Sequence, residues 1–511
     1  MGSKWAEPGS ARQVPSRCLL RVLVGLVICG AAAPARAYDF SVDVRTIGQG
    51  YQVRGFAPDG TNELLSRRRL TQYLDLNVFD IGPDQWHGDD GGRNVFYVDA
   101  SVRFDADFGG YMLGAPTGPN SIQELTGQNE LDILYAFLGG RNVGGHVDFQ
   151  LGRQIHFDLI DFYAFDGADV LFHATQTFGV EAFAGTEVRG TLPLSSPIYE
   201  LDGTSAGSRD PATRPAQNFE MAPLAGAALV AGAPAGPWSA RLSFREIWSA
   251  TANQQPGEPA SGINQEVVSL TAMAAWGNRI FLSGGLRYNV LFDEVDDEQL
   301  ALRVKLTPRQ WLTLEHDFLA PTFDGDSIWN IFSTGAYRDL RASYEIALPR
   351  GVKAYARAFA RFYLATTDEV APTTGPYAGG YPGTYGGQDA GAGAFAAGGS
   401  LGAAWRNARG MLRADAYWDD GYGGRKAGVD ATTRVKVRAP IELEGRLTGY
   451  TWRNDIQPAP NSSGVVFGAE AGGRFRLGQG VHLHLLVEDN VGTYYESQFR
   501  GLAMVELDAG L

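Results

Sequence analysis

One short motif in the sequence matches the pattern of a catalytic nucleophile. Gly203-Thr204-Ser205-Ala206-Gly207 has the G-x-S-x-G spacing of a hydrolase serine. That chemistry requires a strand, a sharp turn and a helix around the serine. A Gly- and Pro-rich stretch surrounds Ser205 instead. We therefore expect no catalytic residue here and no enzyme activity in the chain.

Two other patterns contain groups that bind metal ions. His482 and His484 would share one face of a strand, but the sequence offers no third ligand near them. The acidic run 293–298 could hold Ca²⁺ in a loop, and a solvated anionic loop is the alternative that we favour. The sequence therefore predicts no metal site and no cofactor.

Charged residues elsewhere recur at every second position. Residues 429–438 place Asp430, Thr432 and Arg434 in alternation with small or apolar residues, and segments 95–108, 337–348 and 353–362 repeat the pattern. Successive side chains of a strand point to opposite faces. These segments are therefore predicted to be strands with one apolar and one charged face.

The charged faces carry both signs, with bases in excess. A basic lining would favour anionic solutes, whereas cross-strand ladders of Arg with Asp or Glu would only rigidify the wall. Both interpretations remain open at this point. The predicted basic residues of this lining are Arg103, Arg241, Arg287, Arg303, Arg341, Arg357, Arg413, Arg434, Arg446 and Arg474, and the acidic ones are Asp99, Asp105, Glu345, Asp415, Glu442 and Glu470.

The connections between these strands also follow a pattern. Tight turns such as Gly277-Asn278 and Gly478-Gln479-Gly480 alternate with long polar segments. Outer-membrane barrels combine short periplasmic turns with longer extracellular loops in this way. The long segments are 191–217, 249–263, 319–335, 364–393 and 454–464. Residues 371–398, rich in Gly, Tyr and Ala, suit a loop that narrows the mouth or one with no specific role.

Composition favours the same architecture. The chain has 511 residues, 66 of them Gly, with a net charge of -14. An acidic chain of this kind is not a nucleic-acid binder, and no later segment has the eighteen apolar residues of a membrane helix. Strands with one apolar face can bury that face in lipid while water fills the barrel. We predict an all-β fold: a single transmembrane antiparallel β-barrel of 18–22 strands, with 22 as the best count.

The N-terminus predicts secretion. Basic residues precede an apolar run, and Ala35-Arg36-Ala37 follows as an A-x-A cleavage site. Residues 1–37 are predicted to be a signal peptide cleaved between Ala37 and Tyr38, and residues 38–511 the outer-membrane barrel. Both cysteines, Cys18 and Cys29, lie in the signal peptide.

Aromatic residues near the predicted strand ends suggest girdles at the two membrane interfaces. Ordinary core positions are the alternative. The girdle candidates are Trp248, Trp276, Trp311, Tyr417, Trp418, Trp452, Tyr494 and Tyr495.

One pair of segments resembles a known family. Leu151-Gly152-Arg153-Gln154, followed by Phe165-Asp166-Gly167-Ala168-Asp169-Val170, resembles a strand–loop–strand signature of alginate-export-type outer-membrane barrels. The resemblance implies an eighteen-stranded channel that passes polysaccharide through a lumen rich in Arg and Lys. Strict alternation would turn Arg153 outward unless Gly152 forms a bulge that resets the register.

Three functions follow from these patterns. The first is a channel, either a conduit for export of a polysaccharide, anionic or neutral, or a general or anion-preferring diffusion porin. The second, which we disfavour, is a barrel enzyme. The third is a structural outer-membrane component of an envelope machine. The expected partners are outer-membrane lipid and lipopolysaccharide, and polysaccharide with periplasmic export proteins for the conduit. We expect no nucleic acid and a monomer rather than a trimer.

Overall fold

The computed structural model describes residues 39–56, 62–79, 81, 95–107, 130–188, 222–232, 236–248, 263–291, 293–320, 336–364, 394–455, 463–493 and 495–510. Within these ranges no helix has the length and hydropathy needed to cross a membrane. The predicted signal peptide with its cleavage site, the motif around Ser205 and most of the long polar segments lie outside the described residues.

The described chain is built almost entirely from 22 strands. Those of the first half are β1 (Asp39–Phe56), β2 (Asn62–Phe79), β3 (Val95–Asp107), β4 (Glu130–Val143), β5 (Val147–Phe157), β6 (Phe162–His173), β7 (Phe178–Glu187), β8 (Pro223–Ala231), β9 (Trp238–Trp248), β10 (Ile263–Trp276) and β11 (Ile280–Asn289). Those of the second half are β12 (Glu294–Thr307), β13 (Gln310–Leu319), β14 (Tyr337–Leu348), β15 (Val352–Tyr363), β16 (Phe395–Asn407), β17 (Gly410–Gly421), β18 (Gly424–Arg438), β19 (Ile441–Asn454), β20 (Ser463–Gly478), β21 (Val481–Gly492) and β22 (Tyr495–Gly510).

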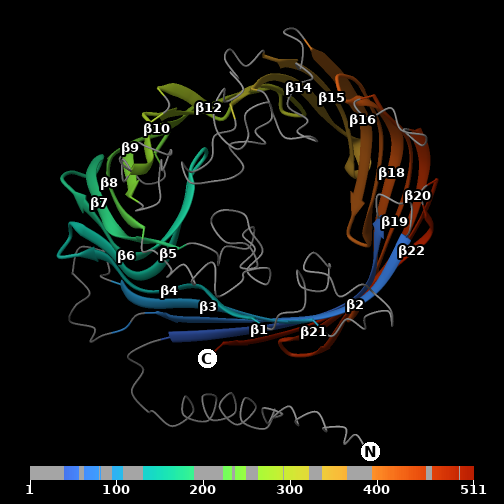
Figure 1. Cartoon of the computed structure of the whole chain (residues 1–511), viewed down its shortest axis with the longest axis horizontal. Helices are drawn as coiled ribbons and strands as arrows, with labels where there is room; N and C mark the ends of the chain where they lie inside the picture. Colours follow the sequence, from blue (N-terminus) through green and yellow to red (C-terminus); the bar gives the residue numbers. More distant parts are fainter. Residues whose placement is uncertain are drawn as a thin grey trace, which may run out of the picture.

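The strands close into one barrel. Each strand pairs antiparallel with its neighbours in sequence, and β1 closes the ring by pairing with β22 from Ser41↔Gly510 to Tyr51↔Arg500. Figure 1 looks down this ring. Closure leaves no unpaired sheet edge, as a strand structure in hydrocarbon requires. The predicted single antiparallel barrel and its best count of 22 strands are confirmed.

The two ends of the barrel differ in their connections. We call one the turn end, because connections such as 277–279, 308–309, 408–409 and 479–480 are tight there. The other, the loop end, is where all the long polar segments predicted above leave the strands. The alternation is less strict than predicted, since 158–161 and 422–423 are tight connections at the loop end.

Two segments that we predicted to be loops belong in part to strands. Glu294 begins β12, so most of the acidic run 293–298 is strand. The reason is local pairing, since Asp296 accepts a hydrogen bond from Arg287 Nε of β11 at 2.7 Å. Residues 395–398, the end of the predicted loop 371–398, likewise form the start of β16.

Candidate functional site

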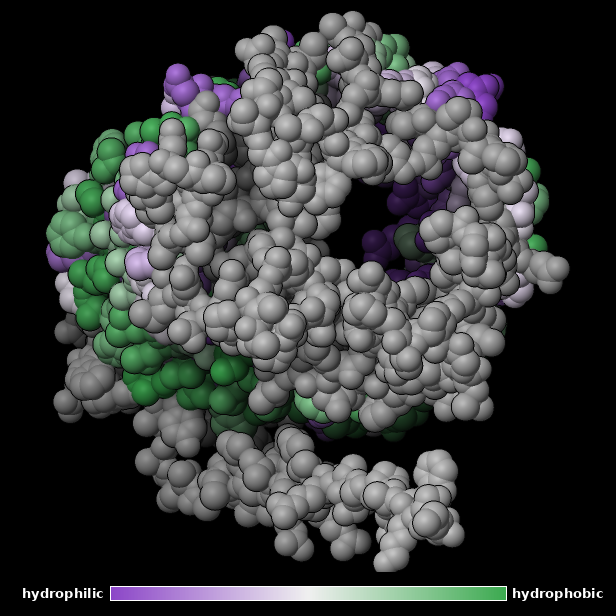
Figure 2. Space-filling view, in the orientation of Figure 1, coloured by the Kyte–Doolittle hydropathy of each residue, from purple (hydrophilic) through white to green (hydrophobic). Residues whose placement is uncertain are grey.

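The barrel wall has an apolar outer face and a polar inner face. In β18 the exposed apolar residues are Val429, Val435 and Val437, while Asp430 and Arg434 alternate with them. Figure 2 shows hydrophobic residues around the outside of the ring and hydrophilic residues inside its opening. The alternation of the sequence is therefore a separation between the two faces of one wall.

The predicted lining residues occupy alternate positions of their strands, and we infer from this alternation that their side chains face the lumen. Arg341, for example, lies beside Leu340, which is 48% exposed on the outer face. Asp105 lies in β3, but its side chain is outside the described residues. Three of the aromatic girdle candidates, Trp311, Tyr417 and Trp452, also lie on the inner face, because alternation places them beside lumen charges. The girdle prediction is wrong for these three.

Most basic residues of the predicted lining have an acidic partner. A carboxylate oxygen lies within 4.0 Å of the guanidinium group in nine of the ten predicted arginines. The exception within the described residues is Arg357, which lies over the ring of Tyr355 instead. Paired charges of this kind stabilise the wall and cancel much of its field.

Some of these pairs form compact networks. Asp339 is 1% exposed and accepts hydrogen bonds at 2.7 Å from both Arg341 and Arg361. Asp415 accepts hydrogen bonds from Arg413 at 2.6 Å and from the Tyr355 hydroxyl. His484 contacts Glu444 rather than forming a metal pair with His482. Each network joins strands that are neighbours or next neighbours, so it holds the wall in a fixed register.

One hairpin leaves this wall and enters the lumen. Residues 154–165, the tip of β5 and β6 and the turn between them, form what we call the inner hairpin. It extends beyond the residues of β5 that pair with β4, since that pairing ends at Ala136↔Arg153. In Figure 1 the teal strands at β5 curve away from the ring into its interior.

Glycines mark the crease from which the inner hairpin bends. Gly152 pairs with Gly167, and Gly167 pairs with Gly185 on β7. A Cβ atom at Gly167 would lie 2.1 Å from the carbonyl oxygen of Ala184, and one at Gly152 would lie 2.3 Å from that of Ala136. Gly152 also has φ near +130°, a conformation that other residues rarely adopt. Only glycine fits this crease, which explains the two glycines of the sequence motif.

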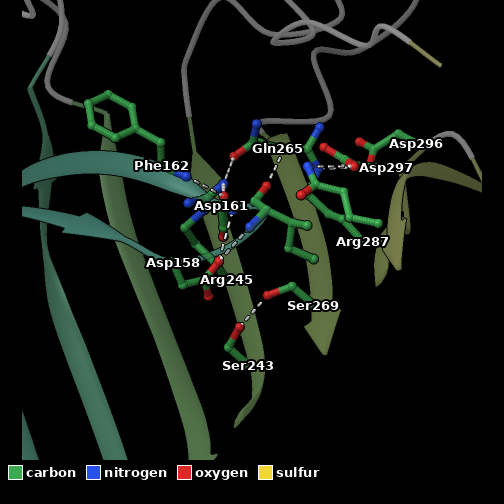
Figure 3. Close-up of polar contacts among 12 residues, drawn as sticks. Asp158, Asp161, Phe162, Ser243, Arg245, Gln265, Ser269, Arg287, Asp296 and Asp297 are labelled. Atoms are coloured by element: carbon green, nitrogen blue, oxygen red, sulfur yellow. Dashed lines mark hydrogen bonds and ion pairs between the residues drawn. The ribbon is translucent and has the colours of Figure 1, made fainter. Parts of the chain in front are cut away.

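The hairpin tip is held by contacts with β9 and β11, two strands that do not pair with β5 or β6. Asp161 forms an ion pair with Arg245 of β9 at 3.0 Å, and both side chains are 5% exposed. The carbonyl oxygen of Ile160 accepts a hydrogen bond from Arg287 Nη1 of β11 at 3.1 Å. Figure 3 shows these contacts converging on the turn, with Gln265 of β10 beside Arg245. The tip therefore reaches across β7 and β8 to β9–β11.

Apolar packing supports the same arrangement. Tyr163, Phe165, Phe183, Leu224 and Ile247 form a buried cluster between the inner hairpin and β7–β9. Arg245 lies 4.1 Å above the ring of Tyr163, a cation–π contact in a desolvated setting. The inner hairpin consequently has a small core of its own and is packed in place, narrowing the lumen on this side.

Two charged residues of the motif, Arg153 and Asp166, face outward. Arg153 donates two hydrogen bonds of 2.7 Å to Asp166 and lies on the same face as Leu151, which is 45% exposed. The register contains no bulge at Gly152. Gln154 is on the opposite face and is 2% exposed. Strict alternation thus places Arg153 on the outer face, where Asp166 neutralises it.

We expect loss of this outward ion pair to destabilise the barrel. Asp166→Leu leaves Arg153 unpaired on the lipid-facing side, which costs about 2–4 kcal/mol near the middle of a bilayer. The urea midpoint for unfolding in lipid vesicles should fall accordingly. The control is the double variant Arg153→Leu with Asp166→Leu, which removes both charges and should recover most of the loss. Equal midpoints for the single variant and the unsubstituted protein would contradict the assignment.

Comparison with solved structures finds barrels of low similarity. OccAB4 of Acinetobacter baumannii is 8% identical to this chain, with a TM-score of 0.42. The match covers 94% of this chain and 100% of OccAB4. A BenF-like porin from Pseudomonas fluorescens Pf-5 is 9% identical, with a TM-score of 0.40, and the match covers 93% of this chain and 99% of the porin. The ferric enterobactin receptor PfeA is 13% identical, with a TM-score of 0.45, and the match covers 92% of this chain and 81% of the receptor.

Sequence comparisons assign no family. No family model matches the chain, and no curated protein matches it either. The 22 strands of the barrel exceed the eighteen that the resemblance to alginate-export barrels implied. The resemblance to that family in particular is therefore not supported.

Proposed function

We propose that this protein is an outer-membrane channel through which water-soluble solutes cross the bilayer. The observation that carries the proposal is the closed barrel with apolar residues outside and charged networks inside. Such a wall suits lipid on one side and water on the other. By analogy with other barrels of this kind, the turn end would face the periplasm and the loop end the cell exterior.

The lining favours weak selectivity with a modest preference for anions. Most lumen arginines are neutralised, as described above, so a strong uniform field is absent from the described wall. Arg357, Lys305 and Lys426 have no described carboxylate within 4.0 Å and would supply local positive potential. Unpaired charges along a pore set the sign of the ions that it admits most readily.

Arg357→Glu should therefore shift the channel toward cations. The change places a negative charge on the inner face where the described wall has an uncompensated cation. The reversal potential under a tenfold KCl gradient should move by several millivolts in the cation-selective direction. Arg409→Glu, the same charge change in the exposed turn between β16 and β17, is the control and should move it less. Equal shifts for the two variants would show that Arg357 has no special place in the pore.

A polysaccharide conduit is a second candidate, because several inner aromatic rings have cations beside them. Lys426 lies 4.5 Å from the ring centroid of Tyr450, and Arg361 lies 4.3 Å from that of Tyr337. Aromatic faces pack against sugar rings, and Lys426, which has no described carboxylate within 4.0 Å, would bind carboxylated sugars. Oligogalacturonate added to one chamber of a planar bilayer should then interrupt the current more than neutral maltooligosaccharide of equal length. Equal interruption by both sugars would favour the general diffusion porin.

A further inference from the structure

Three side chains of types that bind metal ions converge where the inner hairpin meets the wall, and each comes from a different strand. His156 of β5, Asp169 of β6 and Glu181 of β7 each place a ligand atom within 4.8 Å of the other two. His156 pairs with Tyr163 at the hairpin tip, whereas Asp169 pairs with Gln150 at the far end of β5. In a flat sheet these positions would be well separated. They meet only because the glycine crease folds the tip back over the wall.

The histidine ring is held in this position by packing. It stacks on Tyr163, with ring centroids 4.7 Å apart and an interplanar angle of 23°, and Phe183 lies parallel at 6.5 Å. Stacking on Tyr163 covers one face of the imidazole and leaves its edge, which carries the two nitrogens, available to the carboxylates. An orientation fixed in advance is what a metal-binding histidine requires.

The carboxylates retain binding capacity. Glu181 is 5% exposed and accepts two hydrogen bonds from the guanidinium group of Arg241. The bond from Nη2 to Glu181 Oε1 is 2.6 Å long. An ionised carboxylate has about four acceptor positions, so two remain. Asp169 forms no hydrogen bond or ion pair with any other residue in the described part of the chain and lies half-buried beside Glu181.

The local charge is unbalanced. Asp158 and Asp161 of the hairpin turn join Asp169 and Glu181 to give four carboxylates, against the two guanidiniums of Arg241 and Arg245. Arg287, which also reaches the turn, is balanced by its own ion-pair partner Asp296. One carboxylate oxygen of Asp158 is also buried with no hydrogen bond to a described residue. With His156 neutral the group has a formal charge of minus two. A sheltered excess of this size is costly unless a cation or bound protons neutralise it.

We propose that His156, Asp169 and Glu181 bind one divalent transition-metal ion such as Zn²⁺. An imidazole nitrogen with two carboxylate oxygens is a donor set of that class, whereas Ca²⁺ and Mg²⁺ prefer oxygen donors alone. The ion's two positive charges equal the local deficit. Water from the lumen completes its coordination. The ion ties the hairpin tip, through His156, to the wall strands β6 and β7, and this role is additional to solute passage.

The test is Zn²⁺ binding by the purified full chain. The protein is prepared in detergent without a histidine tag, stripped with a chelator, and titrated with ZnCl₂ in a calorimeter. We expect one saturable equivalent. His156→Ala and Asp169→Asn should each weaken binding by more than about tenfold. His482→Ala, which removes a histidine of β21 far along the chain, should leave binding unchanged.

A spectroscopic measurement separates loss of ligands from loss of folding. Co²⁺ should give visible d–d absorption bands in the unsubstituted protein that disappear in His156→Ala, while heat-modifiable migration on gels shows that the barrel is folded. No saturable Zn²⁺ binding by the unsubstituted protein would overturn the proposal. So would equal affinity in folded His156→Ala, or equal binding of Mg²⁺ that is indifferent to His156. Channel conductance is not used, so failure here leaves the proposed function intact.

Discussion

Asp161→Ala should increase the single-channel conductance and the noise of the open current. The substitution leaves Arg245, 5% exposed, without its ion-pair partner at the hairpin tip. Removing one member of a buried pair costs about 3–5 kcal/mol. Residues 154–157 of the tip have no strand pairing with β4, which ends at Arg153, so we expect this cost to release the inner hairpin rather than unfold the barrel. A displaced hairpin widens the lumen that it now narrows.

Two further variants make this experiment specific. Asp455→Ala removes the partner of Arg453 in an exposed pair at the loop end, where the side chains are 54% and 45% exposed, and should leave conductance unchanged. Asp161→Ala combined with Arg245→Met replaces the buried pair by apolar groups and should restore quiet openings. If Asp161→Ala conducts as the unsubstituted protein does, the tip is not held by this pair.

Gly167→Val should prevent the barrel from reaching its folded state. The new Cβ would lie 2.1 Å from the carbonyl oxygen of Ala184 and 2.7 Å from the Cα of Gly185. Both are backbone atoms of the paired strand β7, so no side chain can move to relieve the clash. Overpacking in a rigid setting costs about 1–3 kcal/mol or more, and here it also opposes strand pairing.

Gly50→Val provides the matched control. A Cβ at Gly50 of β1 would have no heavy atom of the described residues within 4 Å, so the same substitution should be tolerated there. The measurement is the fraction of folded, heat-modifiable protein after refolding into detergent. A folded yield for Gly167→Val equal to that of Gly50→Val would mean that the crease does not depend on glycine.

The regular wall could be predicted from the sequence because its determinants are local. Alternation over 337–348 coincides with β14 (Tyr337–Leu348), and the segment 353–362 lies within β15. Each residue there needs only its neighbours in sequence to define an apolar and a charged face. The predicted lining residues with described side chains follow from the same rule.

The inner hairpin could not be predicted in this way. Asp161 and Arg245 contact each other across β7 and β8, and no local pattern specifies which distant residue a turn will meet. His156 and Asp169 likewise meet only after the crease forms. The opposed glycines Gly152 and Gly167 were a usable signal, since glycine inside a strand often marks a bend or close backbone approach.

Partial misassignments have physical causes too. The acidic run 293–298 has loop-like composition, but Arg287 supplies a partner that lets Asp296 lie within the sheet. The sequence predicts Trp311 at a membrane interface, whereas its ring lies on the inner face. The guanidinium carbon of Arg303 is 4.4 Å from the centroid of this ring. An aromatic ring near a strand end satisfies either environment, so composition alone does not choose between them.

The most direct test of the central claim is the current carried by the purified protein in a planar lipid bilayer. If lipid surrounds the apolar face and water fills the charged interior, each insertion should produce a discrete, lasting step of ionic current with a modest preference for anions. Protein that inserts in folded form, as shown by heat-modifiable migration of the recovered sample, yet passes no ions would contradict the channel account.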